Sequence, residues 1–405
     1  MEIYNRININ EICKKVCSGG TPKSTHTEYY GGNIPWLNTK EVNFNRIYKT
    51  EKNITDSGLE NSSAKWIEPN AVIVAMYGAT AGKTAITKIP LTTNQACCNL
   101  MVDENKADYR FVYYALCDDY IRLASMANGG AQQNLNAQQI KDFDIPYPSL
   151  PTQQKIANIL SSLDDKIEVN RRINEQLEEL AGALFKSWFV DFEPFKDGEF
   201  VDSELGMIPK GWKVGKFTDI VEIKGGGTPK TDIAEYWNGD IPFFTPKDIN
   251  DVFCIDTEKN ITDLGLLKCS SKLYCKNTVF ITARGTVGKV CMAGRNMAMN
   301  QTCYALIGKE KYGQHFIYMQ TINIVERMKK KANGAVFSAI TTRDFDSEKI
   351  IIPSLDVVND FLIKIEPLYE SILHNQQEIH HLTTLRDTLL PKLMSGEIDV
   401  NEVEI

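Results

Sequence analysis

Gly78, Gly82, Lys83 and Thr84 are residues of the types found in a nucleotide-binding phosphate loop. Such a loop surrounds phosphates with successive backbone N–H groups and needs four residues between its glycines. Only three residues separate these glycines, and a similar stretch at Gly285 to Lys289 is followed by valine instead of a hydroxyl residue. The spacing therefore favours a tight turn between strands, whose lysines are solvated or touch the phosphates of a nucleic-acid backbone.

The stretches Asn33 to Trp36 and Asp240 to Phe243 resemble the Asn/Asp-Pro-Pro-aromatic motif with which amino-methyltransferases hold a flipped base. The first proline of that motif is missing in both stretches. Nor does the sequence contain a strand followed by a glycine-rich turn of the kind that binds a nucleotide-like cofactor. A structural turn is therefore the favoured interpretation of both stretches.

Histidines and cysteines form no recognisable catalytic or metal site. No histidine has a partner at the spacing of a triad or a metal site, so surface or packing roles are expected for His26, His315, His374, His380 and His381. Cys13 and Cys17 come nearest to a metal-binding motif, but the sequence has no second Cys or His pair at ligand spacing. The adjacent Cys97 and Cys98 favour burial. Reduced, structural thiols in a cytoplasmic protein are the expectation.

Charge is distributed unevenly along the 405 residues, whose net charge is −7. Residues 1–150 have a net charge of 0 and residues 210–350 of +6, whereas residues 351–405 have −7. A basic globular segment beside acidic ones fits a protein with a local contact surface, without establishing one. No apolar run of 18 residues occurs, so neither secretion nor a membrane span is expected.

A long helix is predicted from Thr152 to Phe189, because apolar residues recur at the four-three spacing of a coiled-coil seam. A second copy follows at an offset of 205, and the expected seam positions are Ile156, Leu160, Leu163, Ile167, Asn170, Leu177 and Leu184, then Phe361, Ile365, Leu368, Ile372, Asn375, Leu382 and Leu389. Asn170 is expected to face Asn375 and to fix the register of the pair. The second helix is expected to start near Pro367 and to be disturbed near Pro391.

The globular segments repeat as well. Gly19 to Lys23 returns as Gly226 to Lys230 at an offset of 207, and Asn94-Gln95 returns as Asn300-Gln301. The chain is therefore a duplication of a unit that consists of a globular domain of about 150 residues and a long helix.

Each repeated unit is expected to have an α+β or mixed α/β fold. Short apolar runs at Ala71 to Met76 and Thr278 to Thr282 predict buried strands, and residues 106–126 and 311–331 predict helices. The predicted segments are globular domains at 1–150 and 213–353, long helices at 151–190 and 354–395, a linker at 191–212 and an acidic tail at 396–405.

Further motifs flank the helices. Pro-Ser-Leu leads into each helix, and the linker contains Phe189 to Pro194, Ser203 to Gly206 and Ile208 to Trp212. In this order of motifs, over essentially its full length, the chain resembles the specificity subunit of a type I restriction-modification enzyme.

That resemblance implies a DNA-reading subunit without catalysis of its own. Each globular domain would be a target recognition domain for one half of a split site in double-stranded DNA, and an antiparallel helix pair would separate the two domains. Methyltransferase (modification) subunits would dock on the assembly, and restriction (endonuclease and translocase) subunits would join it. S-adenosylmethionine, ATP and magnesium would belong to those partners, so no cofactor is expected in this chain.

The helix length agrees with that role as a spacer. The 33 residues from Ile156 to Trp188 would span about 50 Å as a straight helix at about 1.5 Å per residue. Two half-sites one DNA turn apart are separated by about 34 to 36 Å. The helix pair could therefore act as a ruler.

The duplication also sorts the candidate DNA-binding residues. Lysines equal in both copies are candidates for frame or phosphate contacts: Lys23 and Lys230, Lys40 and Lys247, Lys83 and Lys289. Positions that differ are candidates for base reading: Ser24, Thr25 and His26 against Thr231 to Ile233, Gln132, Gln133 and Asn134 against Val336 to Ser338, and Tyr77 against Arg284. Polar residues after the domain helices can contact DNA or be solvated loop ends: Asn128, Lys329, Lys330, Lys331 and Asn333.

Two other functions remain open on sequence alone. A protein-binding adaptor with paired domains on a coiled-coil spacer would show no salt-dependent binding to DNA. A stand-alone DNA adenine methyltransferase would bind S-adenosylmethionine, although the missing glycine-rich motif counts against it.

Overall fold

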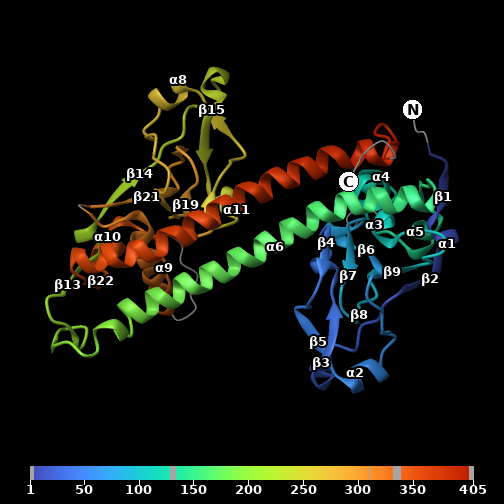
Figure 1. Cartoon of the computed structure of the whole chain (residues 1–405), viewed down its shortest axis with the longest axis horizontal. Coiled ribbons are helices and arrows are strands. Elements are labelled where there is room, and N and C mark those ends of the chain that lie inside the picture. Colours follow the sequence, from blue (N-terminus) through green and yellow to red (C-terminus); the bar gives the residue numbers. More distant parts are fainter. Residues whose placement is uncertain (1–3, 128–133, 310, 332–338, 401–405) are drawn as a thin grey trace. The chain divides into compact units, whose positions relative to one another are not determined.

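The computed structural model describes residues 4–127, 134–309, 311–331 and 339–400. The chain divides into two compact units, one formed by residues 1–166 with 382–405 and the other by residues 167–381. We call them unit 1 and unit 2. Each combines sheets with helices, and each contains a part of both long helices, α6 and α11 (Figure 1).

Unit 1 is built around a five-stranded sheet of order β2-β9-β6-β7-β4 and a three-stranded sheet of order β5-β3-β8. The strands of the larger sheet are β2 Cys13–Ser18, β9 Cys97–Val102, β6 Val72–Ala75, β7 Thr84–Thr87 and β4 Asn45–Ile47. Those of the smaller sheet are β5 Lys52–Ile54, β3 Tyr30–Leu37 and β8 Thr92–Thr93, and a separate pair joins β1 Arg6–Asn8 to β10 Asp144–Pro146. Pairing is antiparallel except between β4 and β7 and between β3 and β8.

Unit 2 repeats this topology strand by strand, with the orders β14-β21-β18-β19-β16 and β17-β15-β20 and a separate pair β13-β22. The larger sheet contains β14 Val221–Gly225, β21 Cys303–Gly308, β18 Val279–Thr282, β19 Val290–Ala293 and β16 Phe253–Cys254. The other strands are β17 Asn260–Ile261, β15 Trp237–Phe244, β20 Ala298–Met299, β13 Lys213–Lys216 and β22 Lys349–Ile352. The equal strand orders confirm the duplication and the α+β class. The predicted buried strands are β6 and β18, whose residues are all buried.

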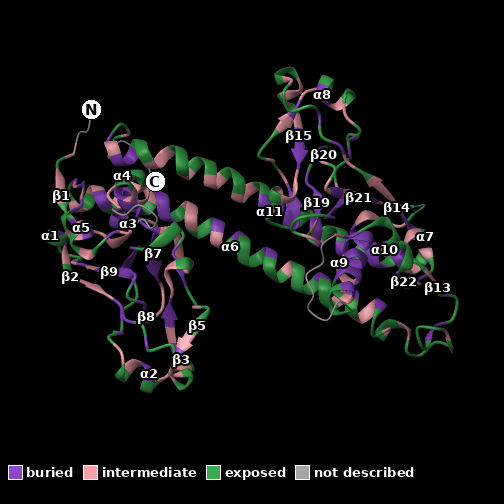
Figure 2. Cartoon of the chain, turned by 180° about the vertical axis from the view of Figure 1, so that it is seen from behind, coloured by how far each residue is buried: buried purple, intermediate pink, exposed green. Residues whose placement is uncertain are grey.

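Helices cover one side of each large sheet. The helix predicted over 106–126 is divided into α3 Tyr109–Asp118 and α4 Tyr120–Ser125, whereas its counterpart α9 is continuous over Gln314–Lys331 and buried along much of its length (Figure 2). The short helices are α1 Ile9–Ile12, α2 Asp56–Glu60, α5 Ala137–Asp142, α7 Phe217–Ile220, α8 Asp263–Leu267 and α10 Thr342–Ser347. Single 3-10 turns are η1 Thr27–Tyr29, η2 Thr39–Glu41, η3 Gly78–Thr80, η4 Glu193–Phe195, η5 Ala234–Tyr236 and η6 Pro246–Asp248.

The long helices are α6, Leu150–Phe189, and α11, Leu355–Ser395. The expectation that the second helix starts near Pro367 is wrong, and α11 also passes through Pro391 without ending. Each proline removes one backbone N–H donor from the helix. Buried residues on both sides of Pro367, Ile365 and Tyr369 among them, hold the helix against the core and offset that loss.

Within unit 2 the two helices run antiparallel, and their asparagines do not pair as predicted. Asn170 donates to Glu378 Oε2 at 2.7 Å, and Asn375 donates to Asn174 Oδ1 at 2.8 Å. The expectation that Asn170 faces Asn375 is therefore wrong. In an antiparallel pair, residue numbers fall along one helix as they rise along the other. Equal positions of the two copies therefore need not lie opposite each other. Because Asn375, the repeat counterpart of Asn170, meets Asn174, Asn170 is expected to meet the counterpart of Asn174, which is Ile379. Ile379 has no polar side chain, and Asn170 bonds to its neighbour Glu378.

The seam itself is apolar and packed. Ile156, Leu160 and Ile167 of α6, and Phe361, Ile365 and Ile372 of α11, are buried. Leu163, Leu177, Leu184, Leu368, Asn375, Leu382 and Leu389 are partly buried. Within each unit, both long helices also have buried residues beside the seam, because they pack on the globular part of that unit as well as on each other.

One further expectation fails. Asn33 to Trp36 do not form a turn but lie within β3, where the buried Trp36 donates from Nε1 to Gly20 O at 2.9 Å. The predicted linker is ordered: Phe192 and Phe195 pack edge-on against Trp212, and β11 Phe200–Val201 pairs with β12 Ile208–Pro209. Aromatic burial thus outweighs the turn-forming composition of both segments.

His315 gives unit 2 a pH-dependent stability. Its buried ring stacks on Tyr369, with centroids 5.0 Å apart, and Nδ1 is 3.8 Å from Glu366 Oε1. Burial, with a smaller effect of Lys276, lowers its pKa to about 4. The unfolded chain takes up this proton near pH 6.5, so stability is lost as the pH falls from about 6.5 to about 4, by about 1.4 kcal/mol per pH unit.

His315→Phe is expected to reduce this loss. Between pH 7 and pH 5 the wild type should lose about 2 kcal/mol more unfolding free energy than the variant, as measured by urea unfolding. His374→Phe replaces an exposed histidine of α11 and is the matched control. An equal pH response of wild type and His315→Phe would contradict the assignment.

Candidate nucleic-acid interface

The Gly-Gly-Thr-Pro-Lys loops are fixed in both units by equivalent bonds. In unit 1, Gly20 N donates to Thr93 O at 2.8 Å and Thr21 Oγ1 bonds to Gln95 Oε1. In unit 2, Gly227 N donates to Met299 O at 3.0 Å, and Thr228 Oγ1 bonds to Gln301 Oε1. The residues shared by both copies therefore form a frame that ties this loop to the Asn-Gln segment.

The glycines of these loops are required for close packing. A Cβ atom on Gly20 would lie 2.1 Å from Ala64 N, and one on Gly226 would lie 2.1 Å from Asn300 O. Both neighbours are backbone atoms, which cannot rotate away as a side chain can. The sequence motif is thus explained by backbone contact and does not depend on a bound phosphate.

The stretch from Gly78 to Lys83 is the tight turn between β6 and β7 that its spacing predicts. Gly78 and Gly82 have φ angles of +74° and +83°, a region that favours glycine. Lys83 Nζ donates to Asn43 Oδ1 at 2.7 Å, so the lysine is held beside the turn. In unit 2, Gly285 to Lys289 repeats the turn between β18 and β19, with positive φ angles at its two glycines.

Tyr77 and Arg284 lie at the entrance of these turns and are both exposed. Tyr77 forms an isolated antiparallel bridge with Asn134, and Arg284 forms the equivalent bridge with Ala339. Met76 N also donates to Ala96 O at 2.8 Å, which places Tyr77 next to the segment that contains Gln95. The structure therefore brings together three segments that are far apart in the sequence: those that contain Tyr77, Gln95 and Asn134.

We call this set the loop face of unit 1: residues 21–26, 38–43, 77–83, 94–96 and 134. Asn94 Nδ2 donates to Asn38 Oδ1 at 3.4 Å and connects the second of these segments to the fourth. The loop face of unit 2 has the equivalent residues 228–233, 245–250, 284–289, 300–302 and 339. Of the predicted base-reading residues, Gln132, Gln133 and Val336 to Ser338 lie outside the described residues, as do Asn128 and Asn333.

The predicted lysines differ in their surroundings. Lys23 and Lys230 are exposed on their loops, whereas Lys40 forms an ion pair with Glu51, and Lys247 Nζ is 3.7 Å from Glu258 Oε2. Exposed pairs of this kind contribute little stability and can exchange for a phosphate. Ser24, Thr25 and Thr231 are exposed beside these loops. The ring of His26 stacks on Tyr29 at 4.8 Å and its Nδ1 is 2.8 Å from Glu28 Oε1.

The lysines at the end of α9 do not act as one group. Lys331 Nζ is 2.6 Å from Glu348 Oε1, and Lys330 lines a groove formed with α6. Only Lys329 approaches the loop face, because its Cε lies 3.5 Å from the Cβ position of Gly288. Gln95 and Gln301 are not among the predicted contact residues, although their recurrence in both copies was a usable signal.

Cys13 and Cys17 give no sign of a metal site. Burial raises the pKa of the Cys13 thiol to about 12, which disfavours the thiolate that a metal requires. Across the parts of the chain that the structure describes, no three His, Cys, Asp or Glu side chains gather as a metal site would need. None of the helices in those parts is both long enough and apolar enough for a membrane crossing.

Two copies of one α+β domain, each with an exposed loop face on a shared frame and with long helices, define a duplicated recognition protein. The family model described as the type I restriction modification DNA specificity domain matches residues 1–179 and 209–392. The chain therefore belongs to the family of type I restriction-modification specificity subunits, in agreement with its motifs.

Individual relatives are similar over nearly the whole chain. The type I restriction enzyme MjaIX specificity subunit of Methanocaldococcus jannaschii is 33% identical, with 96% of this chain and 92% of that protein covered. The HindI specificity subunit of Haemophilus influenzae is 26% identical, with 90% and 94% covered. A crystal structure of the type I system S subunit from M. genitalium matches with a TM-score of 0.63 at 18% identity, covering 97% of this chain and 96% of that one, and shows the same fold.

Proposed function

We propose that this chain selects the DNA sequence on which a type I restriction-modification enzyme acts. Each globular domain binds one half of a bipartite site in double-stranded DNA through its loop face. The long helices set the spacing and provide docking surfaces for the modification subunits, and restriction subunits join that assembly in the cytoplasm. The chain itself is not catalytic, and S-adenosylmethionine, ATP and magnesium act in its partners.

One observation carries this proposal: the two loop faces have the same frame but different exposed side chains. Thr21 and Thr228 make the same bond to a glutamine, whereas Tyr77 in one copy corresponds to Arg284 in the other. A tyrosine and an arginine present different hydrogen-bonding groups to base edges. Two domains that bind different half-sites require the same loop structure with different exposed contact residues, and this is what the two loop faces have.

A domain exchange tests the proposal. The chain is coexpressed with its cognate modification subunit, and adenine methylation is mapped across a genome. Replacing residues 1–150 or 213–353 with the equivalent domain of a relative should change one half of a split methylated sequence and leave the other half unaltered. Methylation that is the same after either exchange would refute the assignment of specificity to these domains.

The salt dependence of DNA binding tests the alternative function, a protein-binding adaptor. A protein that neutralises several phosphates loses affinity for DNA steeply as salt is added, with a slope of about −0.9 per phosphate on logarithmic axes. Replacing Lys23 and Lys230 with glutamine should reduce the steepness of that slope by about one for each phosphate that is no longer neutralised. Binding to DNA that does not change with salt would favour the adaptor.

A further inference from the structure

Gln95 and Gln301 lie in equivalent turns of the two loop faces, and both side chains are exposed. In unit 1, Asn94 Oδ1 accepts from Ala96 N at 3.1 Å, so the asparagine bends the chain around the glutamine. In unit 2, Asn300 Oδ1 makes the same bond, also at 3.1 Å, with the N–H group of the residue after the glutamine. The asparagine of each Asn-Gln pair therefore fixes the backbone that presents the glutamine.

A threonine orients the side chain of each glutamine. Thr21 Oγ1 donates to Gln95 Oε1, and Thr228 Oγ1 donates to Gln301 Oε1. The bond engages the amide oxygen, whereas neither Nε2 group has a hydrogen-bond partner among the described residues. An amide NH2 group has two donor hydrogens. Each loop face therefore presents an oriented pair of donors at the same place.

The Thr-Pro-Lys part of each loop has a bonded carbonyl group. In unit 1, Tyr30 OH donates to Pro22 O at 2.6 Å. In unit 2, Trp237 is the counterpart of Tyr30, and its Nε1 donates to Lys230 O at 3.1 Å. The same position of the repeat thus occupies an acceptor of the loop in both units. The groups that remain for a partner beside the glutamine are mainly donors, which suits a partner rich in acceptors.

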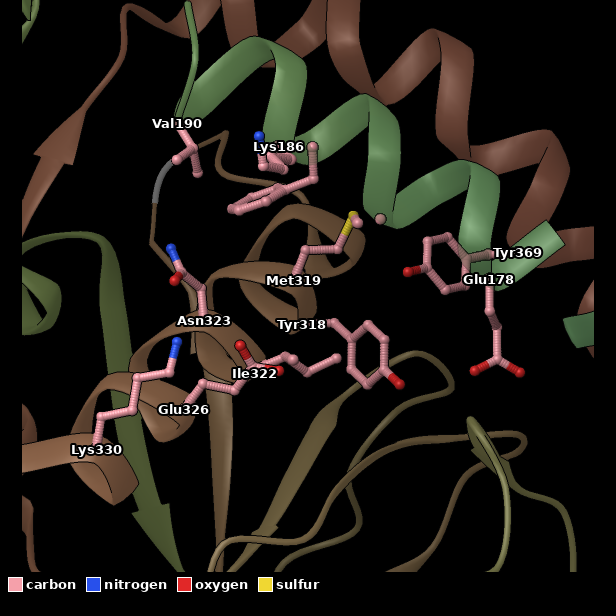
Figure 3. A pocket seen from close by; sticks show the side chains of 12 residues that line it. Glu178, Lys186, Val190, Tyr318, Met319, Ile322, Asn323, Glu326, Lys330 and Tyr369 are labelled. Carbon is pink, nitrogen blue, oxygen red and sulfur yellow. The ribbon is translucent and has the colours of Figure 1, made fainter. Parts of the chain in front are cut away.

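A lysine follows each threonine by two residues. Lys23 and Lys230 are exposed, and neither has an acidic partner among the residues that the structure describes. Other lysines have acidic neighbours: Lys330 lines a groove of unit 2 together with Glu326 (Figure 3). The charges of Lys23 and Lys230 are therefore available to an anion that also meets the glutamine.

The glutamines are equal in the two units, although the residue next to them is not. Arg284 N donates to Thr302 O at 3.3 Å, which places the arginine beside Gln301, whereas Tyr77 has the equivalent position in unit 1. A contact that is identical in two domains with different half-sites must reach a group that is independent of base sequence. Phosphate oxygens are such groups, and they are charged acceptors.

We propose that each glutamine donates from Nε2 to a phosphate oxygen of the DNA backbone, and that the neighbouring lysine contacts the same phosphate group. The threonines are positioning residues, because they hold the amide oxygen away from the phosphate. The inference rests on the proposed function, which supplies DNA as the ligand. We call each set a phosphate clamp: Thr21, Lys23 and Gln95 in unit 1, and Thr228, Lys230 and Gln301 in unit 2.

Gln301→Met tests the contact, because methionine has a similar length but no donor. The full chain is combined with saturating cognate modification subunit, and the Kd for DNA with the methylated split sequence is measured by fluorescence anisotropy. The Kd is expected to rise about tenfold, since a hydrogen bond to a charged acceptor is lost. The factor should stay the same when the bases of the second half-site are permuted. A loss confined to one base sequence would overturn the proposal in favour of base reading.

Salt and charge distinguish the glutamine from the lysine. A neutral glutamine displaces no counterion, so Gln301→Met should leave the slope of log affinity against log salt unchanged, whereas Lys230→Gln should reduce its steepness by about one. Gln301→Glu keeps the oxygen that Thr228 binds but places a negative charge beside the phosphate. It should raise the Kd by more than Gln301→Met does. Equal Kd values for these two variants would contradict a phosphate at this position.

The repeat supplies matched variants. Gln95→Met should raise the Kd by the same factor as Gln301→Met, to within about twofold, and the double variant should raise it about a hundredfold, because separate sites act independently. Gln154→Met makes the same change at an exposed glutamine of α6 outside the loop face, and it should leave the Kd within about twofold. Wild-type affinity in Gln95→Met or in Gln301→Met would overturn the shared clamp.

Thr228→Val tests the positioning role. It removes the hydroxyl group that orients Gln301, and the Kd is expected to rise about threefold. Combined with Gln301→Met it should cause no further rise, because the threonine acts through the glutamine. Losses that multiply in the double variant would overturn the positioning role. All three side chains of the clamp are exposed, so the midpoint of thermal unfolding should change by less than about 2 °C.

Two readouts separate the possible failures. A variant that loses DNA affinity together with thermal stability would assign the glutamine to the structure of the loop and overturn the clamp. A wild-type complex that binds no DNA would overturn the proposed function and the clamp together. Selective binding of one split sequence by the wild type, with unchanged Kd values for the glutamine variants, would overturn the clamp alone.

Discussion

Phe361→Ala is expected to lower the unfolding free energy of unit 2 by about 4 kcal/mol, in the range of buried aromatic truncations. Phe361 is fully buried, and its ring lies 4.8 Å from that of Phe189 and 5.6 Å from that of Trp188, between centroids. Removing it leaves a cavity where α6 and α11 meet the domain, and the surrounding rings can fill it only in part. The calorimetric transition of unit 2 should fall by roughly 10 °C.

Ile363→Ala is the matched control two residues away on α11. Ile363 is 71% exposed, so its truncation removes little buried surface and should change the free energy by less than about 0.5 kcal/mol. A small effect of Phe361→Ala, equal to that of the control, would mean that the helix pair does not depend on this aromatic cluster.

The aromatic cluster also shows what periodicity alone can predict. The four-three spacing correctly located the paired helices, because a seam must recur on one edge. It omitted Phe185 and Phe189, which are buried but lie off the predicted seam. Their partners include Phe316 of α9, a contact with the globular part of the unit that the repeat within one helix cannot reveal.

Register was the least predictable property of the seam. The offset between copies placed Asn170 and Asn375 at equal positions, which suggested that they meet. The partner of each residue depends instead on the axial offset between the two antiparallel helices, which an equal repeat position does not give. Glu378 and Asn174, both missed as partners, therefore complete the polar part of the seam.

The loop faces were predictable in parts. Comparison of the two copies identified Lys23, Tyr77 and Arg284 as candidates, because identical and differing residues separate a frame from its contacts. It could not show that Tyr77 lies beside Asn134, since that proximity depends on a strand pairing across more than 50 residues of chain. Whether these residues contact DNA remains a prediction that the exchange experiment tests.

Gly226→Ala is expected to cost about 3 kcal/mol in unit 2, because overpacking against a fixed backbone forces the loop to move. The new Cβ would lie 2.1 Å from Asn300 O and 2.5 Å from Met299 O. Gly225→Ala is the control: a Cβ there meets nothing within 4 Å, and its φ angle is not positive. The control should change the unfolding free energy by less than about 0.5 kcal/mol.

The same substitution should weaken DNA recognition in one domain only. Displacing Gly226 breaks the bond between Thr228 and Gln301 and moves Lys230 away from the loop face. The Kd of the modification complex for DNA is expected to rise at least about tenfold, which corresponds to about 1.4 kcal/mol. Permuting the bases of the second half-site should then cost the variant less affinity than it costs the wild type, while permuting the first half-site costs both the same. Equal losses at both half-sites would show that the glycine supports folding of the whole chain and not the frame of one reader.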